Sequence, residues 1–286
     1  MTGRKMKKIE KRKKVKVKRQ KKMPKKAVKN SGSELKDFTV ELAKKAGKIL
    51  MDDFGKAHKA QEKGRFGYVT DTDLKAEKLI LGEIKKKYPE HDYLSEEAGG
   101  NPRHSRLRWI IDPLDGTNNH FFGFPAFAVS IALEKDHQIQ LGVIYLPYCN
   151  WMFVAERGKG AFLNDKPIKV SDVEMGRLPF LCDTRLKWAK KKRLGDLDRL
   201  IDHTLNVRMF GSTTQNLCFL ASGSAGVFIE RATKPWDIAA GCLIIEEAGG
   251  LVTDFEGRPW SVYMKNLVAS NSKVHKIVLD LLRNGT

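Results

Sequence analysis

From residue 31 onward, the chain alternates short apolar runs with segments of helical periodicity, and few folds accommodate that pattern. Apolar residues recur at helical spacing from Leu35 to Leu50, and Gly55 ends this predicted helix. The four residues from Ser31 to Glu34 have the form of a capping box. Alternating elements of this kind favour a layered α/β fold in which helices cover sheets.

The pattern differs between the two halves of the chain. In residues 31–172 one further helix is expected, after Asp73 and before Pro89, and short strands dominate the rest. Residues 173–286 alternate strands and helices more regularly. The predicted strands are 92–95, 109–111, 127–133, 140–146, 151–155, 180–181, 207–210, 226–229, 251–253 and 267–269, and the later helices are 187–203, 214–221, 238–248 and 274–282. We therefore expect an N-terminal α+β half and a C-terminal α/β half that form one catalytic unit over residues 31–286.

Most of the positive charge lies in the first 30 residues. The whole sequence has 53 Lys/Arg and 34 Asp/Glu, which gives a formal net charge of +19. Residues 1–30 hold 16 of the bases and one acid, Glu10, so they contribute +15. The other 256 residues hold 37 bases and 33 acids and contribute +4. Residues 1–30 are therefore predicted to be a disordered polybasic tail on a nearly neutral body.

Neither a secretory signal nor a membrane span is expected. The tail has no apolar run, and no stretch of the sequence approaches the ~20 apolar residues of a membrane-spanning helix. The cysteines are far apart and form no CxxC pair, so we expect free, buried thiols in a reducing compartment at Cys149, Cys182, Cys218 and Cys242. These features predict a cytoplasmic protein, or a nuclear one if the source is eukaryotic.

The segment from Trp109 to Thr117 is the most informative about function. A hydrophobic strand is predicted to end at Asp112, Pro113 stiffens the exit, and Asp115-Gly-Thr turns the chain. Two carboxylates three residues apart on such a turn can reach one hard cation or bridge two, as Mg²⁺ sites require. Backbone N–H groups after Gly116, where a helix can begin, suit a phosphate. An ordinary turn between a strand and a helix would explain the same residues.

Other acidic residues lie at the ends of predicted elements. Glu96 and Glu97 follow a predicted strand, where adjacent carboxylates repel each other unless a cation lies between them. The alternative for this pair is a solvated loop. Asp71 and Asp73 precede the second helix, and Asp237 begins an apolar one. N-capping, by Asp71 or Thr72 in the first case, and the helix dipole would account for these acids without excluding a metal site.

Together these segments resemble the inositol monophosphatase family of Mg²⁺-dependent, lithium-sensitive phosphatases. The resemblance spans roughly residues 33–286, and Asp-Pro-Leu-Asp-Gly-Thr combined with a distant Trp-Asp-x-Ala-Ala-Gly is highly specific. The matching segments are 69–73, 95–97, 109–117, 123–125, 129–130, 211–212, 236–241 and 246–250. The resemblance implies a layered αβαβα sandwich of the sugar-phosphatase type, a homodimer, and inhibition by Li⁺.

Carried over position by position, the resemblance implies two to three Mg²⁺ ions in each active site. Asp112 would bridge two of them, and Glu97 would lie near a weaker third ion that Glu96 helps to hold. The implied ligands are Glu96, Asp112, the Leu114 carbonyl, Asp115 and Asp237.

The implied reaction is direct in-line hydrolysis without a phosphoenzyme. Thr117, hydrogen-bonded to Asp73, would orient the attacking water together with Glu96. His120 and Cys242 lie near these motifs, but the family gives neither a role. We expect core packing for Cys242 and a solvated loop for His120.

The resemblance also implies inositol monophosphate as the substrate, with contacts to Gly116, Thr117, Ser212, Thr213, Glu230 and Asp237. Glu230 lies seven residues before Asp237, which is the spacing of the family's acid for inositol hydroxyls. A surface acid paired with Arg231 is the alternative. Thr213-Thr214 replaces small alanines that are common in the family. Lys63 matches a family lysine only approximately, offset by about one residue, so it is not included in the site.

Two rival functions remain open. Within the superfamily, the chain could be a fructose-1,6-bisphosphatase or a sugar phosphatase of dual specificity. A nucleotidase is disfavoured because Asn118-Asn-His follows the Asp-Gly-Thr motif instead of Lys-Glu-Phe. A different class is a regulatory protein that associates with nucleic acid, or another polyanion, through residues 1–30. Such binding would weaken steeply with salt and, without interleaved aromatics, would be independent of base sequence. A solvated tail or a nuclear-import signal is the alternative.

Overall fold

The computed structural model describes residues 32–56, 60–63, 67–101 and 104–283. The predicted disordered tail of residues 1–30 and Ser31, the first residue of the predicted capping box, lie outside the described residues.

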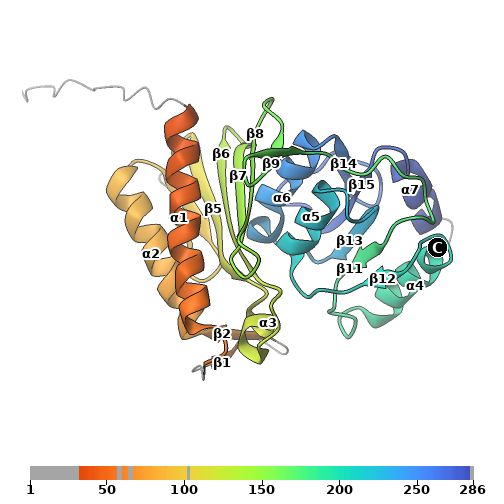
Figure 1. Ribbon diagram of the computed structural model, residues 1–286, viewed down its shortest axis with the longest axis horizontal. Helices are drawn as coiled ribbons and strands as arrows, with labels where there is room; N and C mark the ends of the chain where they lie inside the picture. Colours follow the sequence, from red (N-terminus) through yellow and green to blue (C-terminus); the bar gives the residue numbers. More distant parts are fainter. Residues whose placement is uncertain (1–31, 57–59, 64–66, 102–103, 284–286) are drawn as a thin grey trace, which may run out of the picture.

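Helices and sheets alternate in the order αβαβα across the molecule (Figure 1). One helix pair covers the outer face of an eight-stranded sheet, a second pair lies between this sheet and a five-stranded one, and a third pair covers the far side. The predicted layered fold is therefore confirmed. In layer order the helices are α1 (Gly32–Asp53) and α2 (Asp71–Lys87), then α5 (Thr213–Ala221) and α6 (Pro235–Glu247), then α4 (Lys190–Ile201) and α7 (His275–Arg283).

The eight-stranded sheet has the strand order β10-β9-β8-β7-β6-β5-β3-β4 and is antiparallel apart from the β3–β5 pair. Because β3 and β5 are parallel, their carboxyl ends lie at the same edge of the sheet, where Ser95 is paired with Ile111. The strands are β3 (Asp92–Ser95), β4 (Gly99–Gly100), β5 (Leu107–Asp115), β6 (Ala128–Lys135), β7 (Gln138–Leu146), β8 (Trp151–Glu156), β9 (Ala161–Leu163) and β10 (Lys166–Ile168).

The five-stranded sheet is mixed and has the order β12-β11-β13-β15-β14. Strand β11 is parallel to both of its neighbours, whereas β15 is antiparallel to β13 and β14. The strands are β11 (Phe180–Cys182), β12 (Val207–Arg208), β13 (Val227–Arg231), β14 (Gly250–Thr253) and β15 (Asn266–Asn271). Since α5 and α6 contact both sheets, a division into domains at residue 172 stays a prediction.

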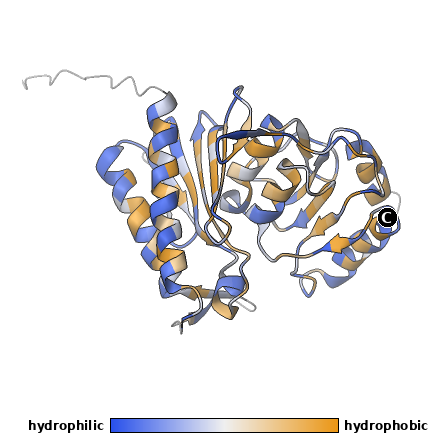
Figure 2. Ribbon diagram, in the orientation of Figure 1, coloured by the Kyte–Doolittle hydropathy of each residue, from blue (hydrophilic) through white to orange (hydrophobic). Residues whose placement is uncertain are grey.

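Residues 238–245 of helix α6 are all buried because the helix lies between two sheets, whereas the outer helices have separate hydrophobic and hydrophilic faces (Figure 2). Helix α6 also packs closely. A Cβ on Gly142 of β7 would lie 2.7 Å from the Ala240 carbonyl oxygen, and one on Gly241 would lie 2.4 Å from Leu217 Cδ1. The small residues Ala240 and Gly241 therefore let α6 lie close to β7 and to α5.

The structure differs from the expected strands at β5 and adds strands that were not expected, among them β4, β9 and β10. Strand β5 continues past Asp112 to Asp115, with a register shift between them, because Pro113 has no N–H for the ladder and pairing resumes only at Asp115 with Ala128. No strand was expected before residue 92, but β1 (Ala60–Lys63) and β2 (Gly67–Thr70) form an antiparallel hairpin there.

Three cysteines, Cys182, Cys218 and Cys242, are buried and free, as expected, but Cys149 is exposed and the prediction of burial is wrong there. Cys149 lies in the turn between β7 and β8, which faces outward. None of the helices in the described ranges is both long and apolar enough to cross a membrane.

Candidate active site

A cavity of about 490 Å³ opens beside the carboxyl end of β5 and the first residues of α5 and α6. Both halves of the chain contribute to it. Lys63, Gly67, Tyr68, Glu96 and 114–118, with the buried Asp112 just before them in β5, form the part that we call the N-terminal wall. Residues from 183–188, 211–216 and 234–237 form the C-terminal wall. Most of the predicted site residues therefore meet in one place.

The bulge in β5 brings two carboxylates to this point. Asp112 is only 1% exposed, and its Oδ1 accepts a hydrogen bond from the Leu114 N–H at 3.0 Å. Asp115 lies at the cavity surface. Gly116 then turns the chain with φ +84°, and a Cβ there would lie 2.6 Å from the Ala126 carbonyl oxygen, so only glycine fits. Helix α3 (Thr117–Phe122) follows at once, as the sequence predicts.

Asp73 connects α2 to the site. Its Oδ1 accepts from Thr117 Oγ1 at 2.9 Å, the bond that the family resemblance implies, and its Oδ2 accepts from the Thr70 N–H and hydroxyl at 2.8 and 2.5 Å. Thr70 is therefore the N-cap, and the prediction of Asp71 or Thr72 in that role is wrong. Burial raises the pKa of Asp73, although these hydrogen bonds oppose the shift.

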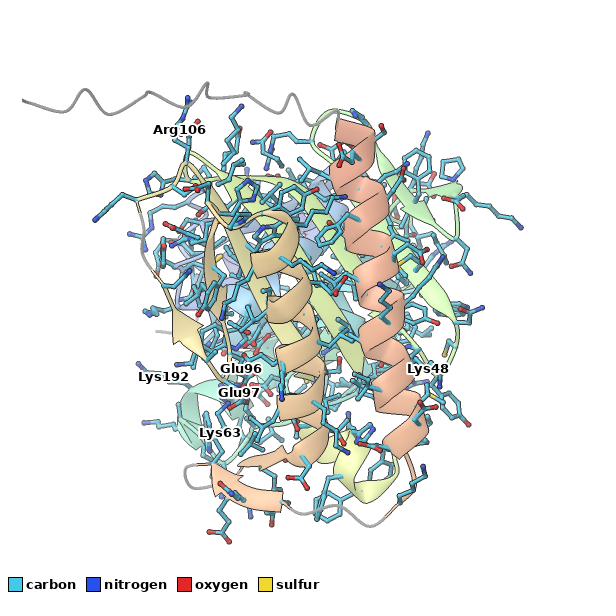
Figure 3. All side chains as sticks on the ribbon, turned by 90° about the vertical axis from the view of Figure 1, so that its left-hand side faces the viewer. Lys48, Lys63, Glu96, Glu97, Arg106 and Lys192 are labelled. Carbon is cyan, nitrogen blue, oxygen red and sulfur yellow. The ribbon has the colours of Figure 1, made fainter. Side chains whose placement is uncertain are left out.

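Glu96 and Glu97 follow β3 and point toward Lys63, which lies at the end of β1 (Figure 3). Lys63 Nζ donates to Glu96 Oε1 at 2.7 Å and also to Glu97. Glu77 of α2 holds the same loop by accepting from the backbone N–H groups of Glu97 and Ala98 at 3.2 and 3.0 Å. The glutamate side chains are 24% and 12% exposed, so the solvated-loop alternative is wrong.

Asp237 is the third residue of α6, not its N-cap. The helix begins at Pro235 with Lys234 as the cap, and the Lys234 N–H donates to Asp237 Oδ2 at 3.3 Å. Proline at the first position fixes the helix start without losing a hydrogen bond. Asp237 thereby faces the cavity from the C-terminal wall.

The two threonines at the start of α5 have different partners. Asp115 Oδ2 accepts from Ser212 Oγ at 2.5 Å, from the Thr214 N–H at 2.8 Å and from Thr214 Oγ1 at 2.6 Å. Thr213 Oγ1 instead donates to Glu230 Oε2 at 2.9 Å. The hydroxyl groups of these two threonines therefore each hold one acid in place.

Glu230 is buried, and the alternative pairing with Arg231 is wrong. Its Oε1 forms an ion pair with Arg185 Nη2, whereas Arg231 donates to both oxygens of Asp196, at 2.5 and 2.9 Å. Glu230 and Arg231 are neighbours on β13, so their side chains point to opposite faces of the sheet. Burial raises the pKa of Glu230 to about 7, against the opposing charge of Arg185.

The carboxylates at the cavity repel one another. Burial raises the pKa of Asp112 well above its ordinary value, and the charges of Glu96, Asp115 and Asp237 add to the shift. Burial, and then the charges of Glu230, Asp115 and Glu96, likewise raise the pKa of Asp237 well above its ordinary value. The pKa of Glu96 is raised by burial in spite of the neighbouring lysine. These four acids therefore feel one another's charge although they come from distant segments.

The donor set fits a hard divalent cation. As the side chains stand, no three acidic, histidine or cysteine groups of the described residues lie close enough together to ligate one ion, because Asp115 and Glu96 also bind protein donors. The four carboxylates and the Leu114 carbonyl nevertheless offer only oxygen, and their mutual repulsion favours a cation between them.

Three groups that were not predicted from the sequence to belong to the site lie there in the structure. Lys63 and Arg185 line the cavity, and Glu77 supports the Glu96 loop. Glu77 lies four residues after Asp73 on the same face of α2, a signal that the sequence did contain. Glu230, by contrast, is outside the cavity lining in the described structure.

Two further predictions near the site have opposite outcomes. His120 is fully buried, with Nε2 2.8 Å from the Leu50 carbonyl oxygen, so the expected solvated loop is wrong. It lies in α3, which packs its inner face against the helix layer. Core packing of Cys242 is confirmed.

The inositol monophosphatase family model matches residues 32–285. A fructose-1,6-bisphosphatase/inositol-1-monophosphatase of Thermotoga maritima is 34% identical, over 86% of this chain and 94% of that protein. An inositol-1-monophosphatase of Mesorhizobium japonicum is 38% identical, over 88% and 97%. A Nus factor SuhB of Vibrio cholerae is 36% identical, over 86% and 95%.

A solved structure shows the same fold. The crystal structure of extragenic suppressor protein SuhB from Bartonella henselae superposes with a TM-score of 0.85 at 36% identity, and covers 88% of this chain and 99% of that one.

Proposed function

The chain belongs to the inositol monophosphatase family, and from that premise we propose that it is a Mg²⁺-dependent phosphomonoesterase that hydrolyses inositol monophosphate to inositol and phosphate. The observation that supports this most is how four acids lie: Glu96, Asp115 and Asp237 line one cavity, and their charges add to the rise in the pKa of the buried Asp112. Thr117 and its bond to Asp73 lie at the same cavity.

In this proposal the four carboxylates and the Leu114 carbonyl hold two to three Mg²⁺ ions, with Glu97 beside them. Bound Mg²⁺ would supply a water of lowered pKa and charge stabilisation for the leaving oxygen. The substrate phosphate would lie against Gly116 and Thr117, at the start of α3. Li⁺ would inhibit by competing for one of the cation positions.

Thr117 has the geometry to orient a water molecule. Its hydroxyl has one hydrogen and two acceptors within reach, Asp73 Oδ1 at 2.9 Å and the Leu114 carbonyl at 3.0 Å. With that hydrogen engaged, the Oγ1 lone pairs are available to accept from the attacking water, and Glu96 would be its second acceptor. No covalent intermediate is needed, so hydrolysis is direct.

The test is phosphate release from inositol 1-phosphate as a function of Mg²⁺ concentration. We expect activity that EDTA abolishes and that Asp112→Asn lacks. Activity that is unaffected by EDTA, or no release of phosphate from any ester, would contradict the proposal.

A sugar bisphosphate is a second candidate substrate. The name of the Thermotoga maritima relative joins fructose-1,6-bisphosphatase to inositol-1-monophosphatase, and Arg185 gives this cavity a cation for which the inositol proposal has no use. The same assay with fructose 1,6-bisphosphate distinguishes a dual phosphatase from a strict inositol monophosphatase.

A regulatory role through nucleic acid is a candidate from another class. It is supported by the +15 charge of residues 1–30 and by relatives named Nus factor. Deletion of residues 1–30 should abolish salt-sensitive binding to RNA and leave hydrolysis intact. Loss of hydrolysis on deletion would show that the tail serves the active site instead.

A homodimer and a cytoplasmic location are also part of the proposal. Light scattering on the purified chain tests the first, and imaging of a tagged full-length chain tests the second.

A further inference from the structure

A second polar cavity, of about 390 Å³, lies at the other end of the eight-stranded sheet from the candidate active site, and we call it the edge cavity. The active site is beside the carboxyl end of β5, whereas Arg108 of the edge cavity is the second residue of that strand. Figure 3 shows Arg106, which also lines the edge cavity, near the top of the molecule and Glu96 well below it. The described residues that line the edge cavity are all polar, and they include three acids and two arginines.

One row of the sheet places three charged side chains next to each other in the edge cavity. Asp92 of β3 is paired with Arg108 of β5, and Arg108 is paired with Glu134 of β6. Paired residues point to the same face of a sheet. Here it is the inner face, because Ile110 and Ala132, one row further along, belong to the core around α6. Asp92 and Glu134 are only 7% and 4% exposed. Two acids and one base therefore lie side by side on a buried sheet face.

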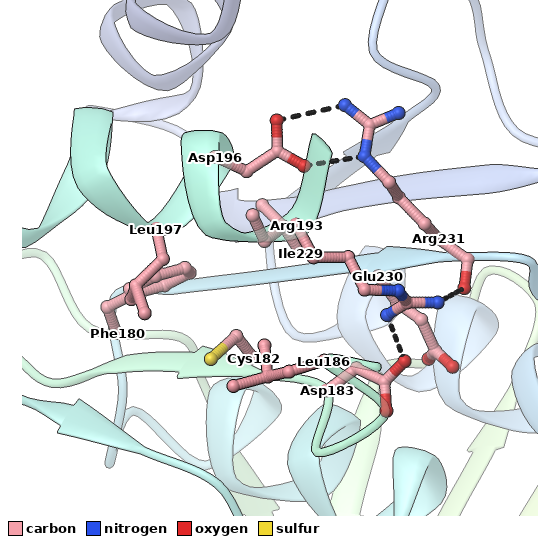
Figure 4. A pocket seen from close by; sticks show the side chains of 10 residues that line it. All are labelled: Phe180, Cys182, Asp183, Leu186, Arg193, Asp196, Leu197, Ile229, Glu230 and Arg231. Carbon is pink, nitrogen blue, oxygen red and sulfur yellow. Dashed lines mark hydrogen bonds and ion pairs between the residues drawn. The ribbon is translucent and has the colours of Figure 1, made fainter. Parts of the chain in front are cut away.

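The carboxylate of Glu134 has a donor at only one of its two oxygens. Its Oε2 forms an ion pair with Arg108 Nη2 at 2.5 Å. Its Oε1 is the only buried carboxylate oxygen in the described ranges without a hydrogen-bond partner. Asp196 shows the usual arrangement, since both of its oxygens accept from Arg231, at 2.5 and 2.9 Å (Figure 4). Because a buried oxygen of a charged group is costly without a donor, Oε1 is expected to receive one from a bound molecule.

The charge of the edge cavity indicates that this molecule is a cation. Arg106 donates to both oxygens of Asp136, at 2.7 and 2.5 Å, so this pair is neutral. Asp92 and Glu134 then face the single charge of Arg108, which leaves one negative charge in excess when histidine is counted as neutral. No three acidic, histidine or cysteine groups of the described residues lie close enough together to ligate a metal ion. An ammonium group supplies a positive charge together with three N–H donors.

We propose that the edge cavity binds an alkylammonium group, with Glu134 Oε1 as its main acceptor and Asp92 as the second carboxylate beside it. The site is separate from the candidate active site, and hydrolysis of a phosphate ester makes no use of it. Its ligand is a primary amine in its protonated form.

Such an amine has two sources, a free small molecule or a lysine of this chain. Residues 1–30 include 13 lysines. They precede α1, which begins at the same end of the molecule as the edge cavity. Glu34, in the first turn of α1, forms an ion pair with Lys87 at 3.2 Å, and Lys87 is the last residue of α2, five residues before Asp92. Both sources share one chemistry, and the experiment distinguishes them.

The experiment measures the binding of three probes that share a chain of five carbons and differ in charge. The probes are 1,5-diaminopentane, the neutral pentane-1,5-diol and the anion glutarate. Glutarate is included because Arg108 Nε also has no hydrogen-bond partner in the described ranges, which makes an anion the rival ligand. Titration calorimetry is carried out on the full-length chain with Mg²⁺ in excess, so that Mg²⁺ and not the probe binds the acids of the candidate active site.

Glu134→Gln removes the charge of the main acceptor and keeps its shape. Glu83→Gln is the matched control, because Glu83 also forms one ion pair, with Lys45 at 3.7 Å, but lies on α2 outside the edge cavity. We expect the diamine to bind about tenfold or more tightly than the diol or glutarate, as one charge-assisted hydrogen bond provides. Glu134→Gln should remove about tenfold of that affinity, and Glu83→Gln should not change it. Equal affinity of the diamine for Glu134→Gln and for the unchanged chain, or a preference for glutarate, would overturn the proposal.

Asp92→Asn covers the case in which Glu134→Gln does not fold. This variant leaves the ion pair between Glu134 and Arg108 intact and removes only the second carboxylate. The affinity for the diamine should fall about two- to threefold. If the affinity is unchanged in Asp92→Asn and the variant binds the diol as tightly as the diamine, the assignment of the edge cavity is refuted.

Deletion of residues 1–30 identifies the source of the amine. The shortened chain keeps the whole segment that the inositol monophosphatase family model matches, residues 32–285. If a lysine of residues 1–30 occupies the edge cavity, the deletion should raise the affinity for the diamine severalfold, because the competing group is gone. An unchanged affinity assigns the site to a free amine. The absence of any preference for the diamine in both the full-length and the shortened chain would refute the site itself.

Discussion

The two walls of the cavity are built in different ways. On the N-terminal wall, Glu96 follows Ser95 of β3 and Asp112 follows Ile111 within β5, and Ser95 is paired with Ile111, so sheet pairing alone brings the two acids together. The C-terminal wall combines residues from 183–188, 211–216 and 234–237, which only long-range contacts hold in place. Asn119 joins the walls by donating to the carbonyls of Ala126 and Phe210, both at 2.7 Å.

The difference concerns charge as well as construction. The N-terminal wall gathers acids that repel one another and suits cations. At the C-terminal wall, arginines pair with Asp183 and Glu230, whereas Asp237 joins the acids that repel one another. Catalysis by the proposed mechanism therefore depends mostly on the first wall, and choice of substrate mostly on the second.

The largest expected effect comes from removing a charge at the N-terminal wall. Asp112→Asn should lower kcat/KM by about 10³-fold or more, because metal-ion catalysis supplies several kcal/mol of charge stabilisation. The same change should raise Tm in EDTA by a few degrees, since burial and the neighbouring acids raise the pKa of Asp112 and its ionised form destabilises the fold. Activity assays and calorimetry measure the two effects.

Asp254 is the control for Asp112, because the protein lowers its pKa whereas it raises that of Asp112. Its side chain accepts from Arg258, whose bonds to Asp254 outweigh burial and lower the pKa of the carboxyl. Asp254→Asn should therefore lower Tm and leave activity unchanged. A fall of Tm in both variants would show that repulsion from the neighbouring acids does not make the ionised Asp112 side chain destabilising.

Thr117→Ala tests whether the N-terminal wall also orients water. The loss of Oγ1 should lower kcat about 10²-fold, the lower range for a positioned proton-transfer group, with little change in KM. Thr117→Ser keeps the hydroxyl that binds Asp73 and should retain most of the rate. Equal rates for the alanine and serine variants would remove Thr117 from the mechanism.

Removing the hydrogen bonds that residues of the C-terminal wall donate to Asp115 should have a smaller effect. Ser212→Ala and Thr214→Val each remove one donor to Asp115 Oδ2, and we expect the Mg²⁺ concentration for half-maximal activity to rise about tenfold. Thr213→Val is the matched control, because its hydroxyl binds Glu230. The Mg²⁺ requirement should not change in that variant, whatever happens to KM for substrate.

The smallest effect is expected away from both walls. His275 lies between Thr253 Oγ1 at 2.9 Å and Ser270 Oγ at 2.7 Å, and burial lowers its pKa to about 4. Because the unfolded chain binds this proton near pH 6.5, stability is complete above pH 6.5 and is lost as the pH falls toward 4. The loss should be about 1 kcal/mol at pH 5.5. In His275→Gln the unfolding free energy should be flatter over this interval, and an unchanged slope would assign the titration to another group.

Much of the fold could be predicted because its signals are local. Helical periodicity, the proline and glycine stops, and the apolar α6 all report on neighbouring residues, and the layered architecture follows from them. The hairpin of β1 and β2 was missed because both strands have only four residues and neither has an apolar alternation to reveal it. The continuation of β5 was missed because proline usually ends a strand, and here a bulge accommodates it.

By itself, the sequence determined the acids of the N-terminal wall, because the residues that place Asp112 and Asp115 are adjacent to them in the chain. Only the tertiary structure decided which cation pairs with Glu230. Arg231 is its neighbour in sequence but points to the opposite face of β13, and Arg185, 45 residues away, lies beside it in space. Partners across a strand or between layers depend on how distant segments pack, and spacing along the chain does not record that.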